Sequence, residues 1–197
     1  MKDISSKEDI MLEDYQKLGR VSVKARIRAL KGFEAEDINV KGLLESDGKI
    51  ICKNVVNVKG EILGDEIDCQ VMELHGKIRV KKLNSDKVKI ISSRGSTINH
   101  IISKDVFLVN GSSAKRDEDI MKAIVDKIGI NLNVGSVKEG KTFKVDLIES
   151  DNVELENVHV KKLVGINVKL RNKCKIEYLN CKGKLEISDD SIVINKV

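Results

Sequence analysis

The sequence contains no proline and no tryptophan, and aromatic residues make up only 3% of its 197 residues. Proline cannot donate a hydrogen bond to a β-ladder, so its absence fits a chain made mostly of paired strands. The shortage of aromatic rings argues against a nucleic-acid partner, because single-stranded nucleic acid stacks its bases on such rings. A net charge of +5 indicates a mildly basic surface, without the strong bias of a dedicated nucleic-acid binder.

Targeting and membrane-spanning segments are also missing. Residues 1–14 lack the basic start and the apolar run of a signal peptide. No apolar stretch approaches the length that a membrane span needs. We therefore expect a cytoplasmic protein. A peripheral location at the inner face of the cell membrane is the alternative.

Signatures of catalysis and metal binding are absent as well. The four cysteines include no C-x-x-C pair, so no metal site is expected, and Cys52 and Cys69 are expected to point inward as small hydrophobes. The histidines His75, His100 and His159 fall on different expected turns, with no carboxylate in the same column. No phosphate-binding glycine loop or nucleophile motif occurs. We expect no enzyme activity, no cofactor and no small-molecule substrate.

What the sequence does contain is a repeat of 16 to 18 residues. Its unit runs apolar, polar, apolar, basic, small, as in Ile38–Gly42 and Val56–Gly60. Alternation of this kind is typical of a strand with one buried face, and so short a period suits one turn of a β-solenoid. Three apolar columns keep this step: Val40, Val58, Leu74 and Ile90; Phe33, Ile50, Ile67, Leu83 and Ile101; and Ile27, Leu44, Ile62 and Ile78.

Three columns predict three short strands in each turn. The expected fold is therefore all-β, a three-faced parallel β-helix whose narrow core is filled by aliphatic side chains. Glycines at 42, 60 and 76 would lie at a corner, where a positive φ or a missing Cβ is useful. A β-sandwich of short strands is the alternative, although a sandwich does not require three columns to keep step.

Two segments depart from the repeat. In residues 1–19, Ser5 and Glu8 match a capping box and Gly19 is a suitable stop, so we predict an N-terminal helix that covers the first turn as a lid, with a frayed tail as the alternative. Residues 111–130 carry acidic residues followed by isoleucines at four-residue spacing. This pattern predicts an inserted amphipathic helix and linker that packs on a face of the solenoid, or alternatively binds a membrane or a partner.

The repeat occupies the remaining two blocks, residues 20–110 and 131–197. In the second block, Cys174 and Ile176 are expected to stack under Ile192 and Ile194. The spacing favours one continuous solenoid interrupted by the inserted helix, and two separate solenoids remain the alternative.

Several segments of these blocks resemble the bactofilins, the polymer-forming cytoskeletal β-helix proteins of bacteria. Leu83–Ile90 and Gly95–Ile98 are similar to the end of the first half of the longer, Gram-positive bactofilin-like proteins. Asp146–Asn157 is similar to the start of their second half, and the likeness continues through Val164–Val168 and Cys174–Tyr178. The resemblance implies a right-handed β-helix that assembles end to end into filaments or scaffolds and has no chemistry of its own. A helical lid at the N-terminus would oppose assembly from that end.

Two hypotheses for function follow. The first is a non-catalytic scaffold that self-associates through the open strand edges of its end turns. Its candidate residues are Val21, Val23, Leu185, Ile187, Ile192 and Ile194. The second is a monomeric adaptor that binds a membrane surface or another scaffold protein through a face of the solenoid or the inserted helix. Its candidate residues are Lys24, Lys41, Lys59, His75, Ile120 and Ile124.

Overall fold

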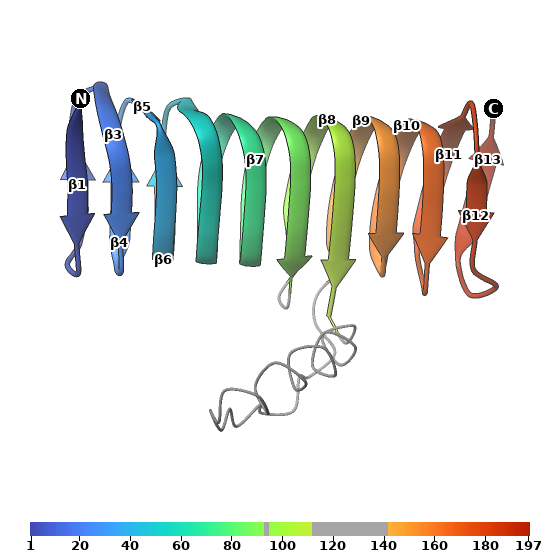
Figure 1. Ribbon diagram of the computed structural model, residues 1–197. Helices are drawn as coiled ribbons and strands as arrows, with labels where there is room; N and C mark the ends of the chain where they lie inside the picture. Colours follow the sequence, from blue (N-terminus) through green and yellow to red (C-terminus); the bar gives the residue numbers. More distant parts are fainter. Residues whose placement is uncertain (93–94, 112–141) are drawn as a thin grey trace, which may run out of the picture.

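The computed structural model describes residues 1–92, 95–111 and 142–197. These residues form an all-β, parallel solenoid of about ten turns, and they contain no helix. Figure 1 shows the turns stacked along one axis, with the two termini at opposite ends of the stack. The predicted β-solenoid is confirmed. Its right-handed sense, taken from the family likeness, stays a prediction.

All thirteen strands belong to one sheet that coils around the core. Their bounds are β1 (Lys2–Ser6), β2 (Ile10–Leu12), β3 (Gln16–Val23), β4 (Arg26–Ala29), β5 (Phe33–Ala35), β6 (Asp37–Ser46), β7 (Ile50–Ser92), β8 (Thr97–Asn110), β9 (Phe143–Glu156), β10 (Val158–Arg171), β11 (Lys175–Cys181), β12 (Leu185–Ile187) and β13 (Ile192–Lys196). Strand β7 runs without a break through several turns (Figure 1).

The strand register places the apolar columns over one another. Val40 pairs with Val58, Phe33 with Ile50, and Ile27 with Leu44. Further along, Ile90 pairs with Leu108 and Leu83 with Ile101. The members of all three predicted columns are buried: Val40, Val58, Leu74 and Ile90; Phe33, Ile50, Ile67, Leu83 and Ile101; Ile27, Leu44, Ile62 and Ile78. Inward-facing positions of each turn thus contact the same positions of the next, and apolar burial is continuous along the axis.

Glycine occupies one corner in three successive turns for a steric reason. Gly42, Gly60 and Gly76 have φ values of 151°, 145° and 146°, a region that residues with a Cβ rarely adopt. A Cβ on Gly60 would lie 2.0 Å from the carbonyl oxygen of Gly42, and one on Gly76 would lie 1.8 Å from that of Gly60. The corner therefore lets successive backbones approach closely, as the repeated small residue of the unit indicates.

The two blocks of the repeat are joined directly. Thr97–Val109 of β8 pairs in parallel with Lys144–Glu156 of β9, so residues on either side of 112–141 lie in adjacent turns. The described blocks stack as one solenoid. The predicted inserted helix, with Ile120 and Ile124, lies outside the described residues.

The predicted N-terminal helix is wrong. Residues 1–19 contribute β1, β2 and the start of β3, and they form a further turn of the solenoid in which Ile4 pairs with Val21 and Ile10 with Ile27. Glu8 bonds to Ser6 and not to the predicted Ser5, since the Glu8 N–H donates to Ser6 Oγ over 3.0 Å in the corner between β1 and β2. Serine side chains form such local bonds in turns as well as at helix starts. No helical lid therefore covers the first turn.

Candidate functional site

The C-terminal end of the solenoid has an open strand edge. In the last turn β12 pairs only with β10 and β13 only with β11 among the described strands. Ile187 continues an inward column because it pairs with Leu170, yet 43% of it is exposed since no further described turn covers it. Leu185 also points to the core and packs against it in part. This end combines unpaired backbone groups with uncovered apolar side chains.

Two candidate residues of this end lie on the outer surface, contrary to the predicted column. Ile176 pairs with Val193 and Lys175 with Ile192, so the inward positions of β13 are shifted by one residue from the expected Ile192 and Ile194. Because side chains alternate along a strand, a shift of one residue exchanges its two faces. Ile192 and Ile194 are 59% and 55% exposed and form an apolar rim around the end turn.

The N-terminal end is one turn earlier than the candidate residues Val21 and Val23. Both valines are buried and have a strand on each side, since Val21 pairs with Ile4 and with Ile38. They are therefore excluded from the end surface. The first turn is tied to the second by Asp3, whose Oδ1 accepts from the Arg20 N–H over 2.8 Å. Met11, 59% exposed, is the large apolar side chain most open to solvent in this turn after Met1.

The four basic candidates form a line along the glycine corner. Lys41 pairs with Lys59, Lys24 and His75 extend the line by one turn at either end, and all four side chains are exposed. Among the described residues, no ion pair neutralises Lys24, Lys41 or Lys59. Three uncompensated ammonium groups at the strand spacing of about 4.8 Å make a short basic ridge. The register places Lys41 over Lys59, as the predicted column requires.

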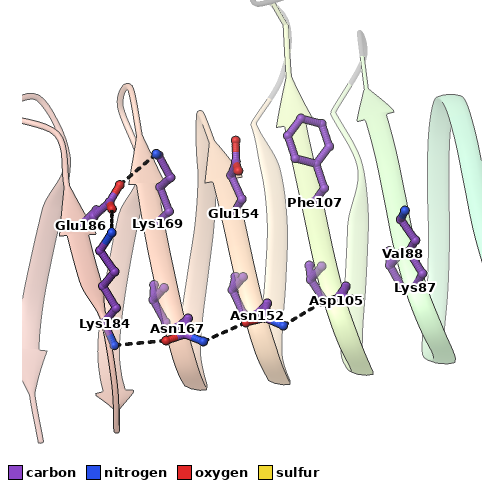
Figure 2. Close-up of a pocket in the computed structure, with 13 residues that line it drawn as sticks. Lys87, Val88, Asp105, Phe107, Asn152, Glu154, Asn167, Lys169, Lys184 and Glu186 are labelled. Carbon is purple, nitrogen blue, oxygen red and sulfur yellow. Dashed lines mark hydrogen bonds and ion pairs between the residues drawn. The ribbon is translucent and has the colours of Figure 1, made fainter.

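A groove on one face of the solenoid was not predicted. It has a volume of about 330 Å³ and is lined by residues of β7, β8, β9, β10 and β12. Figure 2 shows two rows of side chains along it. One row is a hydrogen-bonded ladder, in which Asn152 Nδ2 donates to Asp105 Oδ1 over 2.8 Å and Asn167 Nδ2 donates to Asn152 Oδ1 over 2.9 Å. The ladder ends at the backbone N–H of Lys184, 3.3 Å from Asn167 Oδ1.

The second row, which we name the central row, points outward from successive turns and extends past the groove, since Glu73 and Lys89 do not line it. Its order along the axis is Glu73, Lys89, Phe107, Glu154, Lys169 and Glu186. The register gives the last five positions, and Glu73 precedes Lys89 by the same 16-residue step that joins Asp68 to Asn84. The signal in the sequence was Phe107 itself, because strict alternation around the buried Val106 and Leu108 places it outside.

Within the central row, Glu186 is the group whose acidity is most changed. Hydrogen bonds from Lys169 and Lys184, with their positive charges, lower the pKa of Glu186 to about 2. Its carboxylate lies 2.8 Å from Lys169 Nζ and 2.6 Å from Lys184 Nζ. Glu186 therefore stays ionised throughout the physiological pH range.

Two histidines do meet carboxylates, which the sequence reasoning did not expect. His100 Nε2 lies 2.7 Å from Glu149 Oε2, and His159 Nε2 lies 3.0 Å from Glu177 Oε1. Each contact is diagonal between neighbouring turns, so the partners do not share a column. The first pair joins β8 to β9 and the second joins β10 to β11, so the two pairs share no residue and no strand.

The cysteines lie inside corners of the solenoid. Cys52 is buried, Cys69 is partly buried one turn later, and burial raises the pKa of the Cys69 thiol to about 12. Cys69 Sγ lies 3.6 Å from Ser85 Oγ, which occupies the same corner of the next turn. In the part of the chain that the structure describes, no cluster of three or more histidine, cysteine or acidic side chains could hold a metal ion.

The described residues include no helix of the length and apolarity that crossing a bilayer requires. In comparisons with known proteins, no family model, no curated protein and no solved structure matches this chain.

Proposed function

We propose that this chain is a non-catalytic, bactofilin-like structural protein of the cytoplasm that assembles end to end through the end turns of its solenoid. The observation that carries the proposal is the C-terminal end, where the inward-facing Ile187 and the rim residues Ile192 and Ile194 are exposed around strands with one free edge. A free edge of this kind is a template for the strand of another molecule.

The energetics favour contact at this end. Full burial of an isoleucine side chain stabilises by about 1.5–3 kcal/mol relative to exposure. Another end turn would cover the inward-facing Ile187 and only part of the outward-facing Ile192 and Ile194, so the three isoleucines together contribute a few kcal/mol. Backbone hydrogen bonds to the open edges of β12 and β13 add direction to the contact, because they require the incoming strand to keep the register of the stack.

Negative-stain electron microscopy and sedimentation across a concentration series test this proposal. The wild-type protein should form elongated assemblies whose length increases with concentration. Ile192→Glu should block them, because it places a charge in the rim that assembly must bury. Ile102→Glu is the matched control, since Ile102 is also an exposed isoleucine but lies in the middle of the solenoid.

The proposal fails if the wild-type protein stays monomeric at high concentration and low salt. It also fails if Ile102→Glu prevents assembly as strongly as Ile192→Glu, because the end turn would then have no special role.

A second candidate function is that of an adaptor at an anionic surface, and the basic ridge favours it. Lys24, Lys41 and Lys59 carry no ion pair among the described residues, so their charge is available to a membrane that contains anionic lipid. Each lysine near such a surface contributes about 1 kcal/mol. The chain would then act as a monomer held at the inner face of the membrane or on another scaffold protein.

Liposome co-sedimentation separates the two functions. The triple variant Lys24→Gln, Lys41→Gln and Lys59→Gln should lose binding by roughly 100-fold if the ridge is the contact. The matched control replaces Lys81, Lys104 and Lys161, which are also exposed and pair with Asp65, Asp86 and Asp146. Equal loss in both variants would show dependence on net charge alone and would contradict a role for the ridge.

A further inference from the structure

Phe107 is the outward-facing phenylalanine of this chain. The other two, Phe33 and Phe143, are fully buried, whereas Phe107 stands on the outer surface of β8 at the middle of the central row. Figure 2 shows its ring next to Glu154, with the ladder of Asp105 and Asn152 on the other side of the groove. Phe107 is half-buried, and in a chain with so few aromatic residues an outward-facing ring beside a groove marks a contact surface.

At equal distances on the two sides of Phe107, the central row carries charges of opposite sign. One turn before it lies Lys89 and one turn after it lies Glu154. Two turns before it lies Glu73 and two turns after it lies Lys169. A half-turn rotation about the strand that carries Phe107 exchanges the two sides. Each cation then faces an anion of the rotated copy.

We propose that this face binds the same face of a second copy, side by side and antiparallel, with Phe107 at the two-fold axis. In this arrangement Lys89 faces Glu154 of the second copy, Glu73 faces its Lys169, and the two Phe107 rings meet. An isologous contact of this type requires a self-complementary surface. A parallel arrangement is excluded by charge, because it places Lys89 over Lys89 or over Lys87.

The available charges support the contact. Lys89 and Glu73 form no ion pair within the described residues, so both are available to pair with opposite charges of the second copy. Glu154 binds Arg171 through Oε1 at 2.6 Å, which leaves Oε2 for a second cation. In the proposed dimer, Asp105 of the hydrogen-bonded ladder faces Asp105 of the second copy across the two-fold axis. Its charge is moderated by the bond from Asn152 and by Lys87, its neighbour in the preceding turn.

The contact is small. From Glu73 to Lys169 the central row covers four strand steps, roughly 19 Å. A single row of side chains of this length buries less area than the roughly 800 Å² per partner of a stable interface. A single pair of faces is therefore weak, and copies already joined end to end would pair through many such faces with greatly increased avidity. The lateral contact does not depend on the end turns, so it remains when end-to-end assembly is blocked.

Cysteine cross-linking at the two-fold axis tests the proposal. The variant Phe107→Cys, made in the full-length Ile192→Glu chain, should give a disulfide-linked dimer on mild oxidation. Ile102→Cys in the same background is the control, because Ile102 is exposed on a different face. The Ile192→Glu chain without a new cysteine measures cross-linking through the native thiols. A dimer specific to Phe107→Cys supports the proposal, and equal yields or no dimer overturn it.

Charge reversal tests the antiparallel pairing. Lys89→Glu or Glu154→Lys, each added to the Phe107→Cys chain, should lower the cross-linking yield roughly tenfold, equivalent to about 1.4 kcal/mol. Two-fold symmetry makes each single change remove two ion pairs and introduce two repulsions. The double reversal should restore the yield, and failure to restore it overturns the pairing.

A second pair of residues keeps this test independent of the Arg171 contact. Glu73→Lys and Lys169→Glu should behave in the same way, singly and together. Asp105→Asn should increase the yield, because it removes the like charges that meet at the axis while keeping an acceptor for Asn152. A decrease with Asp105→Asn would contradict the proposed axis.

Discussion

Val193 stacks on Ile176 in the last pair of strands, and the flanking Ile192 and Ile194 therefore point away from the core. This relationship predicts opposite effects on stability for neighbouring residues. Ile192→Ser and Ile194→Ser should change the free energy of unfolding by less than about 0.5 kcal/mol. Val193→Ala should lower it by about 1 kcal/mol, since Val193 packs partly against the core. Denaturant unfolding measures the difference, and the opposite ranking would show the register to be that of the sequence prediction.

The glycine corner predicts a large effect for a small change. Gly60→Ala places a Cβ 2.0 Å from the Gly42 carbonyl oxygen at a φ of 145°, so the backbone of two turns must move. Strained φ angles cost about 1–3 kcal/mol, and we expect a loss of at least this size in thermal or denaturant unfolding. Gly64→Ala is the control, because its φ is ordinary and its Cβ would meet the nearest atom at 3.3 Å. Similar losses for both would contradict a specific role for the corner.

Small polar side chains at another corner bind the backbone. Ser85 Oγ lies 3.0 Å from the carbonyl oxygen of Gln70 and 2.9 Å from that of Lys87. Ser85→Ala should destabilise by about 0.5–1.5 kcal/mol, because a nearly buried acceptor loses its donor. Ser85→Cys should cost less, since Cys69 occupies the equivalent position one turn earlier. Unfolding measurements on the two variants decide this, and equal stability of wild type and Ser85→Ala would speak against the bond.

The carboxylate of Glu186 should titrate far below its usual range. With Lys169 and Lys184 bonded to it, the pKa of Glu186 is about 2 against an ordinary value of 4.5. The depressed pKa means that the stabilisation is complete above 4.5 and is lost as the pH falls through about 2. NMR titration should show Lys169→Gln raising the pKa towards 4.5, as should added salt, which screens exposed charges. Lys182→Gln, a neighbouring exposed lysine, should leave the titration unchanged.

Direct pairing of β8 with β9 predicts that residues 112–141 are dispensable for the solenoid. A short glycine–serine linker in their place should keep the strand content measured by circular dichroism. The stability should change by about 1 kcal/mol, the difference in closure entropy between loops of these lengths. Deleting 157–164 instead, which is half of a turn, should disrupt the stack, because the inward positions of the following strands would no longer align with those of β9. Loss of strand content with the linker would show that the two blocks do not depend on this pairing alone.

Much of the fold was predictable because its core pattern is local. The alternation around Val40 and Val58 is visible within five residues, and the period follows from comparing neighbouring segments. The N-terminal turn escaped prediction because Ser5 and Glu8 match a helix start, whereas pairing with β3 stabilises the strand. Propensity signals of this kind are weak and tertiary contacts override them. The phase of β13 was missed for a related reason. Ile192, Val193 and Ile194 are all apolar, so the sequence pattern is the same whether Val193 or its two neighbours point inward.

The central row shows what no local pattern contains. Phe107 and Glu154 are 47 residues apart in the sequence and neighbours in the stack, and the row exists only once the turns are in register.

By itself, the sequence determined that this protein is a stack of short strands around aliphatic columns, because the buried faces repeat at a fixed distance along the chain. The tertiary structure decided where the stack begins, which isoleucines surround its last turn, and which charges align beside Phe107. Those features depend on which residues meet across turns. That pairing follows from the free energy of the whole stack, to which each segment contributes only a part.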